Sequence, residues 1–549
     1  MKIGIFIAYP PRSELSNQGL GRLLRSIISG ISQTDQGSVV LLCPSWLKTD
    51  VEQLLHGIPG ARLQIVSKKK IPLVVKLWDK FLAKGRKKPK APGRLSRWKK
   101  RILDRVSKIS RGAGRVVLRL LSSDNDAVVG VSLIALALLA ILVSPIALIA
   151  VALLAAVILL VRANILSKLR RRASTLQMRV KGYIKRTLNA LLQKAVPSIG
   201  QVVLREVTHR ESLQLVAMAN RMKDVDVWFS PTVFWPEFNL IDAPRVLSFP
   251  DMLISEFPSA FASSIKDAPD IFGRAQKTIS GGTHFTAYSH HTAEKALIEQ
   301  FSVPSENVTV IPHASMNLLP LIDIKGTMDD AFARDQFARN LIDGFRLTSW
   351  QGNEYLATMD LSSTKFIFYP SQLRPNKNIM NLVKGYEIAL REKFIYAKLV
   401  LTGNPAHVPE VMDYIRKNRL QYDILFAYDV PDQVLAALYS RAALVVNPTL
   451  YEGGFPFTFT EGMSVGTPSI MSDIPQVTEY ISGELADRML FQPMSPNDIA
   501  EKIAFGINNR RDLYELQKPL YDRLKGRSWS DVADDYLRVF AAVIEQKRQ

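Results

Sequence analysis

Short apolar runs alternate with amphipathic stretches along most of this chain, and this alternation constrains its fold more than any other feature. Residues 2–8 and 38–43 are apolar runs typical of buried strands, and residues 19–31 between them have helical periodicity. A second series of the same kind begins at residue 365 and reaches a strand at residues 442–447. Strands that alternate with helices are typical of doubly wound α/β domains with parallel sheets. The sequence therefore predicts two Rossmann-like domains whose strand carboxyl ends face a common cleft.

The 549 residues leave room for two or three domains, and an insertion divides the first of them. The single cysteine, Cys43, excludes a disulfide framework and suits a reducing compartment. Residues 321–364 form a mixed helical stretch to which the sequence assigns no role. We assign a first Rossmann-like domain in two parts, residues 1–67 and 195–345, with the insertion, residues 68–194, between them. A second Rossmann-like domain spans residues 346–529. We expect the C-terminal helix, residues 530–549, to cross back to the first domain.

The positive charge of the chain is concentrated in the insertion. The net charge is +21, but residues 68–194 alone hold 30 Lys and Arg against four Asp, which gives +26. The rest of the chain is therefore slightly acidic, at −5. A basic segment of this kind binds either nucleic acid or an anionic membrane surface, so its apolar content decides between the two.

The insertion contains 35 consecutive residues without a charge, 127–161. A straight helix of this length spans roughly 52 Å, well beyond a hydrocarbon core of about 30 Å. Basic flanks place both ends on the cytoplasmic side by the positive-inside rule. A helical hairpin or a re-entrant wedge in one leaflet satisfies this condition, whereas a single span does not. The alternative is a buried helical pair in a soluble core, although such a composition is rare there.

The flanks of the uncharged stretch have the pattern of interfacial helices. Apolar residues such as Trp98 and Ile102 recur at three- and four-residue spacing among lysines and arginines before it, and Ile184 and Leu188 repeat the pattern after it. Basic amphipathic helices with an interfacial tryptophan lie on anionic leaflets. Continuity with the uncharged stretch favours anionic membrane lipids over nucleic acid as the partner.

Residues 451–468, YEGGFPFTFTEGMSVGTP, carry the strongest functional signal. They follow the predicted strand 442–447 and contain a Gly-Gly-Phe-Pro turn, a short helical stretch with Glu461, and a Gly-Thr-Pro turn before another apolar run. A strand, a glycine loop and a helix start place free backbone N–H groups at the carboxyl edge of a sheet, where phosphates bind. Glu452 and Glu461 flank this predicted anion site, and carboxylates there suit sugar or ribose hydroxyls better than phosphate.

A family resemblance rests on several motifs in a fixed order: residues 3–8 with 19–22, 228–231 with 246–251, 287–290 with 307–313, 369–378, 401–404, 431–439, 451–468, and Trp529. Together they resemble glycosyltransferase family 4, whose members are retaining nucleotide-sugar enzymes with the GT-B fold. The resemblance covers nearly everything except the insertion and residues 321–364. It implies the fold class α/β, GT-B: two doubly wound Rossmann-like domains facing a cleft, with a basic membrane-binding helical insertion in the first domain.

The resemblance implies where the diphosphate of the donor binds. Lys377 lies in a predicted strand-to-helix loop and matches the family's lysine, which would neutralise the leaving group. The family's arginine five residues earlier is replaced by Gln372, and Arg374 is the candidate to supply that charge. Donor-binding roles are also assigned to five glycines and one phenylalanine: Gly19, Gly21, Gly403, Gly453, Gly454 and Phe455. Gly19 and Gly21 could instead form only a tight strand-to-helix turn.

Glu461 matches the second glutamate of a family pattern in which seven residues separate two glutamates, and this implies a contact with the donor ribose. Counting back seven intervening residues leads to Gly453, not to Glu452. Either a one-residue bulge at the paired glycines returns Glu452 to the sugar, or that contact is absent. We assign catalytic roles to Lys377, Glu452 and Glu461. Asp251 is either an acceptor-side residue or the start of an Asx-turn.

Metal and cofactor chemistry is not expected. His290, His291 and His313 lack metal-ligand spacing with acidic or cysteine partners, and no Asp-x-Asp motif lies at a suitable strand end. No nucleophile-and-base constellation stands out, which fits retaining GT-B enzymes as a class, because the donor's own phosphate is thought to help deprotonate the acceptor. The nucleotide sugar would be a substrate, and the cofactor prediction is none.

These features predict a hexosyltransferase-type, nucleotide-sugar-dependent enzyme at the bacterial inner membrane, with its catalytic domains on the cytoplasmic side. The expected acceptor is a lipid-linked saccharide or a growing surface polysaccharide, as in lipopolysaccharide or exopolysaccharide pathways. The departures at Gln372 and Gly453 favour an alternative, a catalytically silent membrane scaffold of a polysaccharide-assembly complex. A storage-glucan synthase or a phosphorylase is disfavoured by the insertion. Protein partners would be further copies of the chain or members of such a complex.

Overall fold

The computed structural model describes residues 1–13, 15, 19–33, 37–58, 62–84, 128, 131–132, 201–251, 253–257, 268–349, 355 and 358–549. The predicted amphipathic flanks and, apart from residues 128, 131 and 132, the uncharged stretch 127–161 lie outside the described residues. Among the helices that the structure does describe, none combines the length and the apolar character needed to cross a bilayer. The membrane insertion therefore stays a prediction.

Seven described strands form one parallel sheet in the first domain, in the order β3-β2-β1-β4-β5-β6-β7. Neighbouring strands are parallel at every pairing, so the chain returns to the start of each strand through a crossover connection. The strands are β1 (Lys2–Phe6), β2 (Ser38–Leu42), β3 (Leu63–Val66), β4 (Val227–Ser230), β5 (Arg245–Phe249), β6 (Phe285–Ala287) and β7 (Val308–Val310). The helices and helical turns are α1 (Gly19–Gln33), α2 (Lys48–Leu54), α3 (Leu73–Lys84), residues 201–221, η1 (Pro236–Leu240), α9 (Leu253–Glu256), α11 (Ala268–Ser280), η2 (Thr292–Gln300) and η3 (Ser305–Asn307).

The second domain repeats this plan with six described strands in the order β10-β9-β8-β11-β12-β13, again all parallel. The strands are β8 (Phe366–Tyr369), β9 (Lys398–Thr402), β10 (Ile424–Ala427), β11 (Leu444–Asn447), β12 (Ser469–Ser472) and β13 (Leu490–Phe491). The helices and helical turns are η4 (Leu319–Leu321), α12 (Asp330–Ser349), η5 (Pro375–Lys377), α14 (Ile379–Arg391), η6 (Pro405–His407), α15 (Pro409–Lys417), α16 (Asp432–Arg441), α17 (Phe457–Ser464), α18 (Pro475–Thr478), α19 (Gly483–Met489), α20 (Pro496–Asn508) and α21 (Arg510–Lys525).

The predicted α/β class with two Rossmann-like domains is confirmed. Strands β1, β4, β8 and β11 lie at the centres of their sheets and are buried almost throughout, because helices cover both faces of each sheet. This burial explains the continuous apolar runs in the sequence. Strand β10 has the predicted bounds, and β1 ends two residues earlier than predicted.

Helix α12 lies in residues 321–364, the stretch to which the sequence assigned no role, and its packing shows a structural role. Its residues Ala338, Ile342 and Phe345 are buried in a core that also contains Leu438 of α16 and Phe368 of β8. Although the sequence analysis extended the first domain to residue 345, this helix packs on the second domain. It covers one face of the second sheet, opposite the face covered by α14 and α20.

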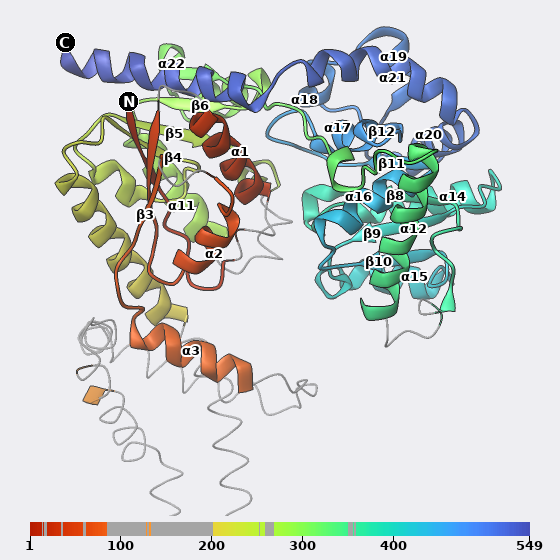
Figure 1. Cartoon of the computed structure of the whole chain (residues 1–549), viewed down its shortest axis with the longest axis horizontal. Helices are drawn as coiled ribbons and strands as arrows, with labels where there is room; N and C mark the ends of the chain where they lie inside the picture. The colour runs from red at the N-terminus through yellow and green to blue at the C-terminus, as the bar shows by residue number, and fades with distance from the viewer. Residues whose placement is uncertain are drawn as a thin grey trace, which may run out of the picture.

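The C-terminal helix α22 (Trp529–Arg548) lies on the first domain, as Figure 1 shows. Tyr536 and Phe540 contact the ring of Phe229 in β4, with ring centroids 5.3 and 5.7 Å apart. Gly30 of α1 lies so close that a Cβ there would be 2.3 Å from the Trp529 carbonyl oxygen. The chain thus leaves the second domain through α21 and ends in the core of the first.

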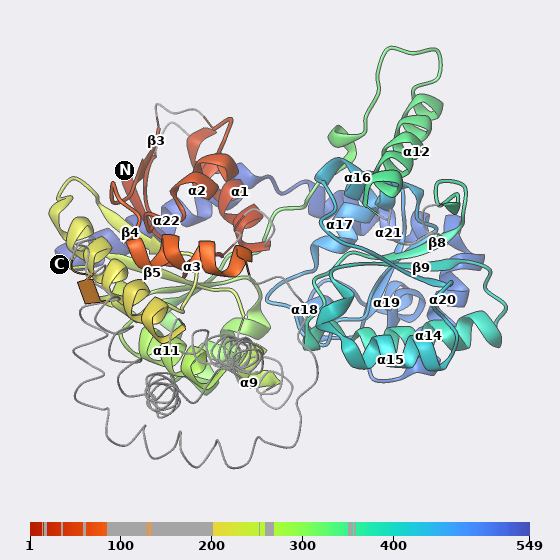
Figure 2. The ribbon, with the colours of Figure 1, turned by 90° about the horizontal axis from the view of Figure 1, so that it is seen from below.

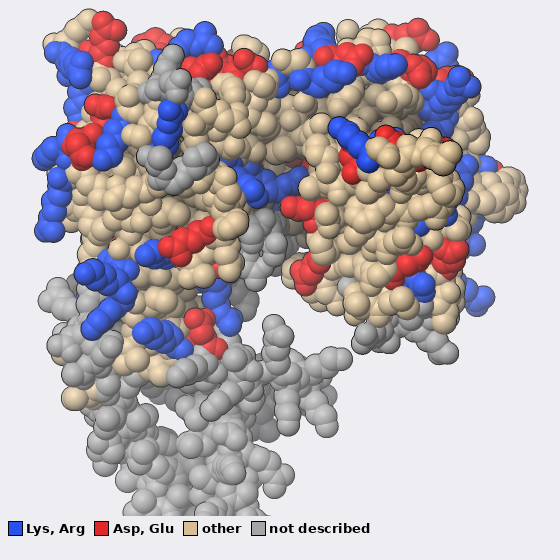
Figure 3. Space-filling view, viewed as in Figure 1, with Lys and Arg blue, Asp and Glu red and all other residues tan. Residues whose placement is uncertain are grey.

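The two domains lie side by side in Figures 1 and 2. The space-filling view in Figure 3 is hollowed between them, with basic and acidic side chains on the edges that face the hollow. In doubly wound sheets, ligands bind beyond the carboxyl ends of the strands. The loops that follow β1, β5, β8 and β11 therefore contain the residues of interest.

Candidate active site between the two domains

Lys377 and Glu452 lie together where β8 and β11 end. The N–H of Leu450 donates to the carbonyl oxygen of Asn376 at 2.8 Å, and Nδ2 of Asn376 donates to the carbonyl oxygen of Tyr451 at 3.3 Å. These bonds join the two loops and bring the Lys377 ammonium group into an ion pair with the Glu452 carboxylate. Both side chains are about one-fifth exposed, at 20% and 22%. The structure thus brings together a cation and an acid that lie 75 residues apart in the sequence.

Glu461 is buried in α17, and both of its carboxylate oxygens are hydrogen-bonded. The Arg22 guanidinium group donates to Oε1 at 2.6 Å, and the Tyr439 hydroxyl donates to Oε2 at 2.5 Å. Burial and the adjacent carboxylate raise the pKa of Tyr439 well above its ordinary value, so the hydroxyl keeps its proton. Burial alone would lower the pKa of Arg22, but Glu461 outweighs it and raises that pKa. Arg22 lies in α1, so this ion pair joins the two domains.

The two ion pairs belong to one cluster. Tyr369 is the last residue of β8. Burial, and then the negative charge of Glu452, raise the pKa of the Tyr369 hydroxyl. Tyr369 in turn interacts with Tyr439, the hydrogen-bond partner of Glu461. Tyr369 and Tyr439 thus lie within electrostatic reach of Glu452 and Glu461, respectively, and of each other.

The paired glycines of the 451–468 motif press against the first domain. A Cβ on Gly453 would lie 1.8 Å from the carbonyl oxygen of Pro250, and one on Gly454 would lie 2.9 Å from Cβ of Tyr288. The carbonyl oxygen of Gly453 also accepts hydrogen bonds of 3.0 Å from the hydroxyls of Ser289 and Thr292. Only residues without a side chain allow this approach. The glycines thus set the distance between the domains at the site.

Asp251 of the first domain and Arg374 of the second interact electrostatically. Burial raises the pKa of the Asp251 carboxyl group, and the positive charge of Arg374 opposes this shift. The same arginine interacts with Tyr9, which follows β1 and whose ring meets that of Trp235 edge-on at 5.0 Å. Arg374, predicted to bind the donor, therefore lies near the predicted acceptor-side residue. Gln372 is exposed on the same loop.

The remaining predicted donor-binding residues are positioned by packing. Gly19 begins α1, and a Cβ on Gly21 would lie 1.9 Å from the carbonyl oxygen of Leu15. Gly403 follows β9 with φ +105°, and a Cβ there would lie 2.8 Å from Cγ of Leu373. The ring of Phe455 packs against Phe459 and Tyr480, with centroids 5.6 and 4.9 Å away. Gly21 and Gly403 are thus required for tight turns, whether or not they also approach a ligand.

The three histidines lie at the contact between the domains. The backbone N–H groups of His290 and His291 donate to the Glu479 carboxylate at 3.3 and 2.8 Å. The His313 ring packs between Tyr288 and Phe457, with centroids 4.1 and 5.0 Å away. Burial, and to a lesser extent Arg527, lower the pKa of His313 to about 3. His313 is therefore neutral and acts as an apolar filler at this contact.

We expect this buried histidine to make stability depend on pH. The unfolded chain binds a proton at His313 below pH 6.5, whereas the folded chain does not until about pH 3. Protonation of His313 therefore does not lower the free energy of unfolding above pH 6.5. Below that pH it lowers this free energy by at most about 1.4 kcal/mol per pH unit. Denaturant unfolding measures the decrease in the free energy of unfolding between pH 7 and pH 5. This decrease should be up to about 2 kcal/mol smaller in His313→Leu than in the wild type. Equal losses would contradict this account.

Two residues of the cluster escaped the sequence analysis as functional residues. Arg22 belongs to the glycine motif 19–22, but nothing in the motif indicates a partner 439 positions away. Tyr439 lies in a helix whose periodicity predicts burial only. Among the described residues, no group of three or more histidines, cysteines, aspartates or glutamates could hold a metal ion.

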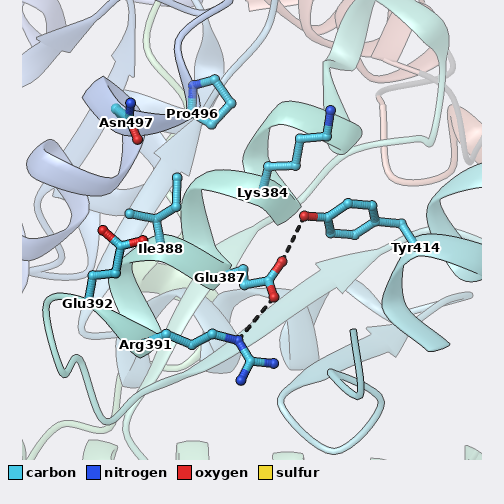
Figure 4. A pocket seen from close by; sticks show the side chains of 8 residues that line it. All are labelled: Lys384, Glu387, Ile388, Arg391, Glu392, Tyr414, Pro496 and Asn497. Carbon is cyan, nitrogen blue, oxygen red and sulfur yellow. Dashed lines mark hydrogen bonds and ion pairs between the residues drawn. The ribbon is translucent and has the colours of Figure 1, made fainter. Parts of the chain in front are cut away.

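A separate pocket of about 370 Å³ lies on the second domain, between α14, α15 and α20 (Figure 4). Two of its four charged side chains, Glu387 and Arg391, form an ion pair with each other. Glu387 accepts hydrogen bonds from the Tyr414 hydroxyl at 2.7 Å and from Nε of Arg391 at 3.0 Å. None of the residues of the two ion pairs lines it. The interdomain cluster, and not this pocket, is the candidate active site.

The comparisons with known proteins concern the family and the fold. Residues 360–523 match the family model described as glycosyl transferases group 1. An uncharacterized glycosyltransferase of Methanocaldococcus jannaschii is 25% identical over 33% of this chain and 46% of its own length. The serotype-specific mannosyltransferase WbdA of Escherichia coli is 25% identical over 34% of this chain and 23% of its own length. The chain thus spans less than half of the length of these curated relatives.

Solved structures extend the likeness to both domains. HepE of Anabaena, crystallised with UDP and glucose, matches with a TM-score of 0.52 at 13% identity, over 99% of this chain and all of that one. A glycosyltransferase of Rickettsia africae matches with a TM-score of 0.51 at 11% identity, over 99% of this chain and 98% of that one. At such identities the likeness shows the fold alone. The family match in the second domain and the architecture of both domains support a glycosyltransferase with the GT-B fold.

Proposed function

We propose that this chain is a membrane-associated, retaining glycosyltransferase of family 4. It would move a sugar from a nucleotide-sugar donor to a lipid-linked or growing surface-polysaccharide acceptor at the cytoplasmic leaflet of the inner membrane. The observation that carries the proposal is the presence of two ion pairs, Lys377–Glu452 and Arg22–Glu461, in the loops and helices that follow the strands and at the contact between the domains. The crystallised complex of HepE with UDP and the naming of WbdA as a mannosyltransferase favour a nucleotide-sugar donor.

The residues of the cluster suit the parts of such a donor. Lys377 neutralises the diphosphate leaving group, because its ammonium group lies at the carboxyl edge of the sheet. Glu461 accepts hydrogen bonds from ribose hydroxyls, and Glu452 from hydroxyls of the transferred sugar. Asp251, on the facing domain, would contact the acceptor.

The proposed reaction needs no nucleophile from the protein. The bond between the anomeric carbon and the diphosphate oxygen breaks, and the acceptor hydroxyl oxygen bonds to the same carbon on the same face. The proton of that hydroxyl passes to the departing phosphate. The protein contributes positioning and charge stabilisation, and we propose that it does so without a metal ion.

Radiolabelled transfer tests this function directly. The full chain would be incubated with each of several nucleotide sugars and with membrane lipid extracts, beside Glu461→Gln as a matched variant. We expect label in the lipid fraction with one donor, and a loss of at least about tenfold in the variant, because a neutral amide accepts weaker hydrogen bonds than a carboxylate. Absence of transfer from every donor would contradict the proposal.

One observation favours the second candidate, a catalytically silent membrane scaffold. Both oxygens of Glu461 and the ammonium group of Lys377 already have partners within the protein. A scaffold would keep these ion pairs as permanent contacts between or within its domains. Calorimetry with a panel of nucleotide sugars separates the two candidates, because a scaffold would bind none of them.

A further inference from the structure

Arg22 is the cation of the cluster that the first domain supplies. Its guanidinium group carries five N–H donors, and among the described residues its one hydrogen-bond partner is Glu461. The side chain is 38% exposed, whereas that of Glu461 is 5% exposed. The carboxylate is thus fixed in the second domain, and the arginine reaches it from the cleft with most of its donors unused.

The cluster holds two cations, as many as a nucleoside diphosphate sugar has negative charges, although its own two carboxylates make it neutral overall. Lys377 and Arg22 contribute two positive charges, and Glu452 and Glu461 contribute two negative charges. A nucleoside diphosphate sugar brings two negative charges and several hydroxyl groups. Each ion pair can exchange partners with it, the cation turning to a phosphate and the carboxylate to hydroxyls. Arginine suits this exchange, since its planar fork binds phosphate oxygens in pairs and it does not lose its proton.

We propose that Arg22 is a donor-binding residue. When the ribose hydroxyls bind the Glu461 carboxylate, the Arg22 guanidinium group releases Glu461 and binds the diphosphate. This inference rests on the proposed function and adds a residue to its site. Because Arg22 belongs to α1 and Glu461 to α17, the exchange makes both domains hold the donor. Donor binding then replaces a direct contact between the domains with a contact through the substrate.

Calorimetry on the full chain tests the exchange, with UDP, GDP, uridine and guanosine as probes. We expect Arg22→Gln to weaken binding of the preferred diphosphate by about tenfold to hundredfold, since a charged hydrogen bond to phosphate is lost. Binding of the corresponding nucleoside should stay equal or become tighter, because the variant frees Glu461 for the ribose. Arg25→Gln is the matched control, since Arg25 lies one turn along α1 and its guanidinium group contacts only the His56 carbonyl at 3.4 Å among the described residues. That control should bind the diphosphate as the wild type does.

The outcomes separate this inference from the function on which it rests. If the wild type binds no nucleoside diphosphate, the proposed function and the role of Arg22 both fail. If the wild type binds one and Arg22→Gln binds it equally well or more tightly, only the role of Arg22 is overturned, because the arginine would then merely occupy Glu461. A helical circular dichroism spectrum and a thermal midpoint equal to those of Arg25→Gln establish that the variant is folded.

Discussion

Replacing Lys377 with methionine is expected to lower kcat of sugar transfer by about 10²- to 10³-fold, the usual effect of removing one charge-stabilising donor. Methionine has a similar length and volume but no charge, so the loop after β8 keeps its packing. In the proposed reaction the leaving diphosphate would lose the cation assigned to it, and Glu452 loses its ion-pair partner. Steady-state kinetics with the donor identified by the transfer assay measures the effect.

A surface lysine of the same domain provides the control for this variant. Lys393 pairs with Glu501, and its side chain is 35% exposed. Lys393→Met removes the same charge away from the cluster and should leave kcat within about twofold, since exposed ion pairs contribute little. If Lys377→Met retains the wild-type kcat, the assignment of the leaving-group site to this loop is wrong.

Adding one methyl group at Gly453 is expected to lower the rate of transfer strongly and to weaken donor binding. The new Cβ would lie 1.8 Å from the carbonyl oxygen of Pro250, which is backbone and cannot rotate away. The two domains must then move apart at the cleft, and a misplacement of about 1 Å costs roughly 100-fold in rate. We expect Gly453→Ala to reduce kcat by about 100-fold or more. Donor affinity should fall as well, because both domains hold the donor, and kinetics and calorimetry measure the two effects.

Gly344 supplies the comparison for the glycine variant. It lies in α12, and a Cβ there would have no neighbour within 4 Å. Gly344→Ala should therefore leave both kcat and donor affinity unchanged. Full activity of Gly453→Ala would mean that the contact between the domains is not part of the active arrangement.

Local patterns in the sequence predicted most of the fold. Strand β10 and helix α14 were found because burial and helical amphipathicity leave periodic signals within a few residues. Strand β13, with only two residues, is too short for such a signal. Helix α12 is visible as a helix, but its domain is not, because its partners in α16 lie about 100 residues away.

The site shows the same limit. Lys377 could be identified because it lies in the motif 369–378, and Glu452 and Glu461 because they lie in the motif 451–468. Three contacts could not be predicted: the pairing of Lys377 with Glu452, the contact of Gly453 with Pro250 and the ion pair of Arg22 with Glu461. The first depends on how two loops of the second domain meet, and the other two depend on how the domains meet. No periodicity in a single sequence encodes contacts of that kind.

A structure of the full chain with the nucleoside diphosphate selected by calorimetry tests the central claim most directly. The account predicts a phosphate oxygen within about 3.2 Å of the Lys377 ammonium nitrogen and the ribose hydroxyls on the Glu461 carboxylate. A diphosphate bound outside the interdomain cleft, with the Lys377–Glu452 ion pair unchanged, would contradict it.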